Sequence, residues 1–200
     1  MERPVFGVTL AGLTLTLLIT CNLFLAFNVR PARSSPATII VPDDYPTIQA
    51  AIDNASAGDT IFVRAGTYNC NIQIDKTLTL KGESNQNTTL RLQRGGLGAE
   101  YGLVGLHVTA SNVTISGFQL ISPVGDDDCV LLIMVDGRGG VADNCVIMDN
   151  VLEEYKTDAL VLMDSQGDVV VGNVIFSQDG SCIDLLSSSN CLLGNNSLSG

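Results

Sequence analysis

The chain has 200 residues, of which 46% are hydrophobic and only 5% aromatic, and it contains 20 Gly and no Trp. A chain of this length can bury one sizeable core, and this composition suits many short strands better than a helical bundle. The net charge of −11 excludes nucleic acid as a partner, because nucleic acid requires a basic face, and argues against electrostatic binding to anionic lipid.

The N-terminal segment 1–37 has the composition of a leader. Residues 5–27 carry no charge and are numerous enough to span a bilayer as a helix. A Pro/Ser/Arg-rich linker follows, in which residues 35–37 offer small side chains to a signal peptidase. Two outcomes stay open, cleavage near Thr38 or retention as a membrane anchor. In both, the rest of the chain is predicted to be exported as a secreted, periplasmic or cell-surface protein.

Residues 41–68, VPDDYPTIQAAIDNASAGDTIFVRAGTY, combine one short helix with strands. Pro46 suits a first helical turn, and four apolar residues then recur on one helical face. After the Gly58-Asp59 turn, TIFV alternates as a strand. A helix this short is not stable alone, so its apolar face requires a partner. The four apolar residues are Ile48, Ala51, Ile52 and Ala55.

Four later stretches can be superposed, and their offsets are 28, 28 and 22 residues. They are NVTISGFQL from Asn112, GVADNCVIM from Gly140, DVVVGNVIF from Asp168 and NCLLGNNSL from Asn190. A period in the twenties indicates a solenoid, and strands without helices indicate parallel β-helix coils. The short helix would then cap one open end of the stack. The alignment predicts two inward columns, Val113–Val141–Val169–Cys191 and Leu120–Met148–Phe176–Leu198.

The opening stretch followed by KTLTLKGES resembles the start of right-handed parallel β-helix proteins of the pectin-lyase-like superfamily. CIDLLSSSNCLLGNNSL is similar to the repeat of the NosD-like, periplasmic copper-associated branch. The resemblance covers residues 38–200. It implies an all-β fold class, a single-stranded right-handed parallel β-helix with an N-terminal capping helix. It does not imply one function, because the superfamily includes lyases, esterases, hydrolases, tail spikes and proteins without known chemistry.

Catalytic residues of this superfamily are hard to place in this sequence. Of the polygalacturonase-like motifs, only the acidic pair has a counterpart, within residues 126–128. A pectin-esterase-like set of Gln, Asp and a following Arg is not recognisable. The sole histidine, His107 in GLHV, alternates outward from Leu106 and Val108 and is predicted to be an ordinary surface residue. We therefore predict no catalytic residues in this segment.

The sequence gives different answers for copper and for calcium, because the two metals require different ligands. Copper favours His, Cys and Met ligands, but Met148 and Met163 are predicted in core columns, so the sequence does not support a copper site. After residue 100 there are 13 acidic residues against two basic ones, which indicates a solvated acidic face. Carboxylates on stacked coils can also form a calcium site. The calcium candidates are Asp126, Asp127 and Asp128, with Asp164 and Asp168 near a later turn.

Five cysteines lie outside the leader: Cys70, Cys129, Cys145, Cys182 and Cys191. Their spacing matches no zinc pattern. We predict that they are core thiols, since Cys packs as a small hydrophobe. A bridge between Cys182 and Cys191 stays open, because export permits disulfides.

Two classes of function follow. The first is a non-catalytic β-helix that binds glycans or surface proteins. The alternative is a polysaccharide lyase or esterase relative whose catalytic coils lie beyond residue 200. The acidic face disfavours a polyuronate substrate unless calcium bridges the two. No capping segment follows Leu198, so we expect further coils or a partner chain at that end.

Overall fold

The computed structural model describes residues 35–93, 97–99, 102–122, 130–139, 142–154 and 156–200. Residues 36–200 form one compact unit. The predicted leader falls almost wholly outside the described residues. In the part of the chain that is described, no helix is long and apolar enough to cross a membrane.

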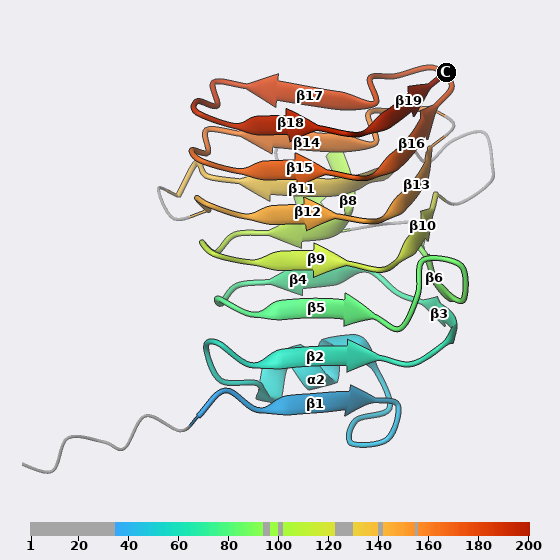
Figure 1. Ribbon diagram of the computed structural model, residues 1–200, viewed down its shortest axis with the longest axis vertical. Helices are drawn as coiled ribbons and strands as arrows, with labels where there is room; N and C mark the ends of the chain where they lie inside the picture. The colour runs from blue at the N-terminus through green and yellow to red at the C-terminus, as the bar shows by residue number, and fades with distance from the viewer. Residues whose placement is uncertain (1–34, 94–96, 100–101, 123–129, 140–141, 155) are drawn as a thin grey trace, which may run out of the picture. The chain divides into compact units, whose positions relative to one another are not determined.

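Three parallel sheets stack into a solenoid of about six turns (Figure 1). Sheet A contains β1 (Thr38–Val41), β2 (Thr60–Val63), β5 (Thr79–Gly82), β9 (Thr114–Ser116), β12 (Val146–Met148), β15 (Val169–Val171) and β18 (Leu192–Gly194). Sheet B contains β3 (Gly66–Asn69), β6 (Thr88–Arg91), β10 (Gln119–Ile121), β13 (Val151–Glu154), β16 (Val174–Ser177) and β19 (Ser197–Ser199). Sheet C contains β4 (Ile72–Ile74), β8 (Gly102–Val108), β11 (Val130–Asp136), β14 (Leu160–Met163) and β17 (Ile183–Leu186), with β7 (Leu97–Ala99) antiparallel to β8.

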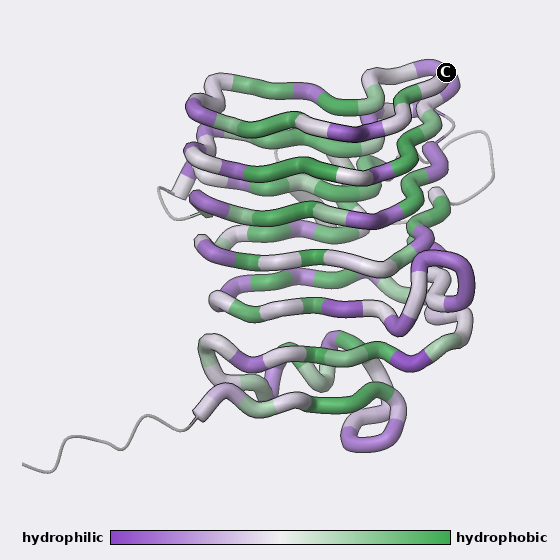
Figure 2. Tube along the Cα trace, in the orientation of Figure 1, coloured by the Kyte–Doolittle hydropathy of each residue, from purple (hydrophilic) through white to green (hydrophobic). Residues whose placement is uncertain are grey.

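The predicted all-β parallel β-helix is confirmed. Each strand pairs with its equivalent one coil along, as in Ile61 with Leu80 in sheet A. Side chains alternate across every strand, so one set of apolar residues fills the interior. Hydrophobic and hydrophilic residues alternate along the coils, and several corners are hydrophilic (Figure 2). Single coils are too thin to bury their own apolar face, and stacking supplies the core.

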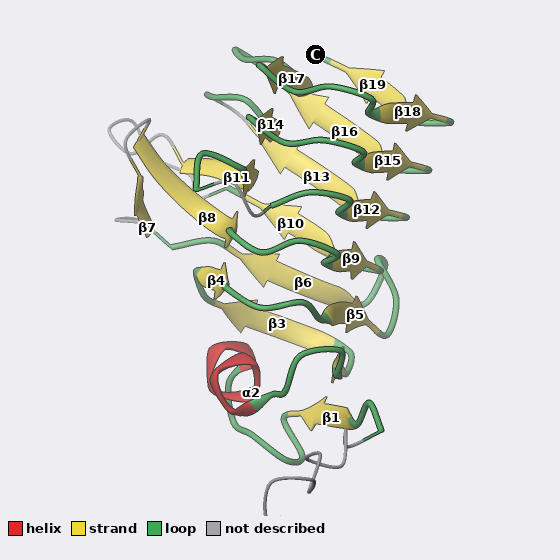
Figure 3. Ribbon diagram, turned by 90° about the vertical axis from the view of Figure 1, so that its left-hand side faces the viewer, coloured by secondary structure: helices red, strands yellow, loops and turns green. Residues whose placement is uncertain are grey.

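Helix α2 (Ile48–Asn54) covers the end of the stack, as the amphipathic pattern predicts. Ile48, Ala51 and Ile52 are buried, and the Thr47 side chain accepts a hydrogen bond from the Ala50 N–H. The helix lies at the end of the stack where sheet C begins with β4 (Figure 3).

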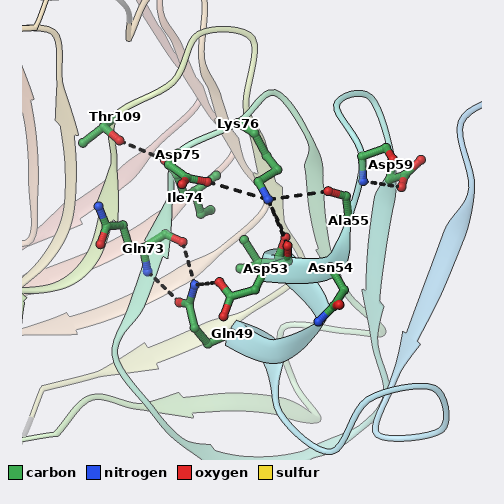
Figure 4. Close-up of polar contacts among 12 residues, drawn as sticks. Gln49, Asp53, Asn54, Ala55, Asp59, Gln73, Ile74, Asp75, Lys76 and Thr109 are labelled. Atoms are coloured by element: carbon green, nitrogen blue, oxygen red, sulfur yellow. Dashed lines mark hydrogen bonds and ion pairs between the residues drawn. The ribbon is translucent and has the colours of Figure 1, made fainter. Parts of the chain in front are cut away.

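The Gln49 amide of this helix replaces a missing neighbouring strand. Gln49 Oε1 accepts from Gln73 N at 2.9 Å, and Gln49 Nε2 donates to Gln73 O at 3.2 Å (Figure 4). Both backbone groups of the middle residue of β4 are thereby satisfied. Lys76 Nζ donates to the carbonyl oxygens of Ile52 and Asp53 at the last turn of α2, where a cation is favoured.

Both predicted columns are correct at their first and last residues and wrong between them, by four residues at the second position and by one at the third. Ile115 pairs with Ile147, Ile147 with Val170 and Val170 with Leu193, offsets of 32, 23 and 23 residues. Corner loops of unequal length cause the error, because they change the coil length without changing the strand pattern. The second inward column is Leu120–Leu152–Ile175–Leu198. Met148, predicted inward, is only half-buried, and buried Met163 belongs to a separate cluster outside the main core.

Three asparagines form a buried ladder at the corner between sheets A and B. Asn173 Oδ1 accepts from Asn150 N at 3.0 Å, and Asn173 Nδ2 donates to Ile147 O at 2.9 Å. Asn196 repeats the pattern one coil along, accepting from Asn173 N at 3.0 Å. The amide oxygens satisfy backbone N–H groups that the turn leaves without strand partners, and the amide nitrogens add a second bond to strand carbonyls.

Candidate functional site

The outer face of sheet C brings together a histidine, an aspartate and an arginine. In β8, Leu106 and Val108 point into the core, so His107 between them points outward. In β11, Val135 points inward and Asp136 outward. Because β8 and β11 are adjacent parallel strands, the two outward side chains meet on one face.

The three side chains form one hydrogen-bonded cluster. His107 Nε2 lies 3.0 Å from Asp136 Oδ2. Arg138 clamps the same carboxylate, with Nε 2.8 Å from Oδ1 and Nη2 2.6 Å from Oδ2, and its backbone N–H also donates to Oδ1. The side chains of His107, Asp136 and Arg138 are 14%, 10% and 22% exposed. We call these three residues the polar cluster.

Gly137 allows the chain to turn so that Arg138 folds back onto Asp136. Its N–H donates to Met163 O on the next coil at 2.8 Å. A Cβ at this position would lie 2.1 Å from Asp164 O, a backbone atom that cannot move aside. The close approach of the two coils therefore requires glycine here.

Arg138 holds the pKa of Asp136 well below its usual range, chiefly through hydrogen bonding; partial burial opposes the shift and the His107 hydrogen bond adds to it. Asp136 is therefore ionised throughout the physiological pH range. An ionised carboxylate only accepts hydrogen bonds, so Nε2 of His107 carries the proton toward Asp136. In a neutral imidazole this leaves Nδ1 as the proton acceptor.

An apolar patch adjoins the polar cluster on sheet C. Val104, Met134, Val161 and Met163 lie outside the main core yet are at most 4% exposed. Met134 is the register partner of His107. The polar cluster therefore lies beside a buried apolar cluster, where hydrogen bonds and ion pairs are stronger than in water.

The predicted calcium residues do not converge among the described residues. Asp126, Asp127 and Asp128 lie outside the described part of the chain. Asp164 is exposed at a turn, whereas Asp168 is buried and accepts from Cys145 N at 2.8 Å. Burial is the main cause of the raised pKa of Asp168. Within the described ranges no three His, Cys, Asp or Glu side chains are placed to hold a metal ion.

The cysteine and histidine predictions have mixed outcomes. Cys145 is buried as predicted, and Cys182 and Cys191 are free thiols rather than a disulfide. His107 does point outward, but it is mostly buried and paired with Asp136, so the prediction of an ordinary surface histidine is wrong. The sequence signal was a run of six apolar residues that ends in Asp136 and is followed by Gly137. This signal indicates the pairing of Asp136 with His107 only once the register of sheet C is known.

No family model and no curated protein sequence matches the chain. Solved structures do match. One is a mutant pectin methylesterase in complex with a hexasaccharide, with a TM-score of 0.50 and 16% identity over 72% of this chain and 55% of that chain. A pectin methylesterase from Erwinia chrysanthemi gives a TM-score of 0.47 and 15% identity over 76% of this chain and 54% of that chain.

The chain has the right-handed parallel β-helix fold of pectin-lyase-like proteins. At these identities the likeness shows the fold alone. The chain spans about half the length of the solved structures that it matches.

Proposed function

We propose that the chain is a carbohydrate-active β-helix that hydrolyses an ester on a glycan at the polar cluster. The observation that carries the proposal is the His107–Asp136 pair, held by Arg138 on the outer face of sheet C. A carboxylate that orients an imidazole is a common arrangement for a general base. That the structural neighbours are pectin methylesterases, one in complex with a hexasaccharide, makes a glycan ester the first substrate to test.

The proposed reaction needs only water as co-reactant. His107 Nδ1 takes a proton from water as the water oxygen attacks the ester carbonyl carbon. The tetrahedral intermediate then expels the alcohol, which receives the proton from His107. The carboxylic acid that is formed releases its remaining proton to bulk water and leaves as the carboxylate. Asp136 stays ionised throughout and stabilises the imidazolium that forms transiently.

A second candidate is non-catalytic binding of a glycan or a surface protein. The hydrogen bonds of Asp136 favour this second candidate, because each of its carboxylate oxygens already accepts two hydrogen bonds from the polar cluster. Such an ion pair also serves to fix a loop on a β-helix face. The NosD-like branch, suggested by the repeat at residues 182–198, belongs with this candidate. Export and anchoring through residues 5–27 are compatible with both.

The test is ester hydrolysis by the full chain, measured as released methanol or acetate on methyl-esterified pectin and on acetylated glycans. His107→Gln keeps a donor for Asp136 but removes the base, so we expect a loss of about 100-fold or more in kcat. Ser116→Ala, on the outer face of sheet A, is the matched surface control and should retain full activity. Equal turnover by His107→Gln would refute the catalytic role. Binding of a glycan without turnover would favour the second candidate.

A further inference from the structure

The polar cluster carries no net positive charge toward a ligand. Arg138 is the only Lys or Arg in it, and its charge is compensated by the bidentate contact with Asp136. After residue 100 the only other Lys or Arg of the sequence is Lys156. Lys156 lies ahead of β14, at the edge of sheet C where the strands begin, whereas Asp136 ends its strand.

Three further carboxylates lie along the same sheet. Gly137 N bonds to Met163 O, so Asp164, the next residue, lies beside the turn that holds Arg138. Asp184 continues the outward column of His107 and Met134 two coils further, after Val161. Asp75 follows β4, whose last residue accepts from Thr109 N just beyond β8. Asp75 and Asp164 are exposed, and Asp184 is half-buried.

Among the described residues, the cation nearest to Asp75 is Lys76, which is directed mainly to helix α2. Lys76 follows Asp75 in sequence, but its Nζ donates to the carbonyl oxygens at the end of helix α2 (Figure 4). Its distance to the nearest oxygen of Asp75 is 3.9 Å, and that carboxylate stays 64% exposed. The described part of this face therefore presents carboxylates on both sides of the polar cluster.

From this charge arrangement we infer that the site takes an ester on an uncharged glycan and discriminates against polyuronate chains. This inference rests on the proposed hydrolase function. A polyuronate carries a carboxylate on each unesterified sugar, and these would approach Asp164, Asp184 and Asp75, whose charge Lys76 compensates only in part at 3.9 Å. Like charges about 8 Å apart in water disfavour binding by about two- to threefold for each pair at low salt. An O-acetylated neutral glycan meets no such repulsion.

The experiment compares kcat/KM of the full chain on acetylated xylan and on pectin with about half of its carboxyl groups esterified. We expect the neutral substrate to be favoured by about tenfold at low salt, with the gap closing as salt screens the carboxylates. Asp164→Asn should raise kcat/KM on pectin about two- to threefold and leave the value on acetylated xylan unchanged.

Asp149→Asn is the matched control for Asp164→Asn. Both aspartates are exposed and both have left-handed backbone, with φ of 54° and 48°, which Asn also tolerates. Asp149 lies at the corner between sheets A and B, so its substitution should leave kcat/KM unchanged on both pectin and acetylated xylan.

The outcomes separate this inference from the function on which it rests. Faster hydrolysis of pectin than of acetylated xylan, with His107→Gln inactive, overturns the inference and keeps the hydrolase. The same holds if pectin becomes the better substrate on addition of Ca²⁺, because a bridging cation would then set the specificity. Absence of turnover on both esters overturns the hydrolase, and the inference with it.

Discussion

Substitution of Asn173 should destabilise the β-helix more than the same substitution of Asn196 in the asparagine ladder. In Asn173→Ala, the backbone N–H of Asn150 loses its partner while Asn150 itself stays fully buried. The carbonyl of Ile147 loses the bond from Asn173 Nδ2 but keeps its place in the ladder with β15. Each buried backbone group left unpaired costs about 1–3 kcal/mol. With about 1 kcal/mol more for the lost bond to the Ile147 carbonyl, the free energy of unfolding should fall by about 2–4 kcal/mol.

The measurement is urea denaturation followed by circular dichroism, with the free energy extrapolated to water. Asn173→Asp keeps the side-chain volume but removes the donor, and should lose a similar amount, because the carboxylate would face the carbonyl oxygens of Ile147 and Val171. The comparison variant is Asn196→Ala. Its side chain is half-buried on the last described coil, so water replaces the lost bonds and the cost should be about 1 kcal/mol. Equal losses for Asn173→Ala and Asn196→Ala would refute the reasoning.

Three further predictions concern the polar cluster, a thiol and the last coil. The pKa of Asp136 is lowered in the folded state, so the stability that the ionised carboxylate contributes is present above its unfolded pKa of about 4 and is lost as pH falls. The difference in unfolding free energy between the wild type and Asp136→Asn should therefore narrow between about pH 5 and pH 2. Denaturant melts measure this difference. Burial raises the pKa of the Cys145 thiol to about 11, so at pH 8 it should react with a thiol reagent only after urea unfolding, and rapid labelling of the native chain would contradict this. Leu192, Leu193 and Leu198 are 58%, 43% and 53% exposed, so this 200-residue chain should self-associate in sedimentation experiments. Leu193→Lys should reduce that association, whereas a wild-type monomer at high concentration would contradict it.

The fold could be predicted from sequence because its determinants are local. Alternation of apolar residues specifies strands, and the spacing of Ile48, Ala51 and Ile52 specifies the helix that covers the stack. Neither the strand pattern nor the helix spacing depends on which coil lies above or below. The same reasoning found the outward direction of His107, which follows from two apolar neighbours in one strand.

The neighbours across coils were decided only by the tertiary structure. Gln73, His107 and Met134 share one outward column, although 34 and then 27 residues separate them. Loop closure costs little more for a long loop than for a short one, so corner loops vary freely in length, and a fixed period cannot find the register. The pairing of His107 with Asp136, 29 residues apart, is a consequence of that register. The strand pattern follows from the sequence alone, but the candidate site forms only because the stacked coils bring the outward side chains of His107 and Asp136 together.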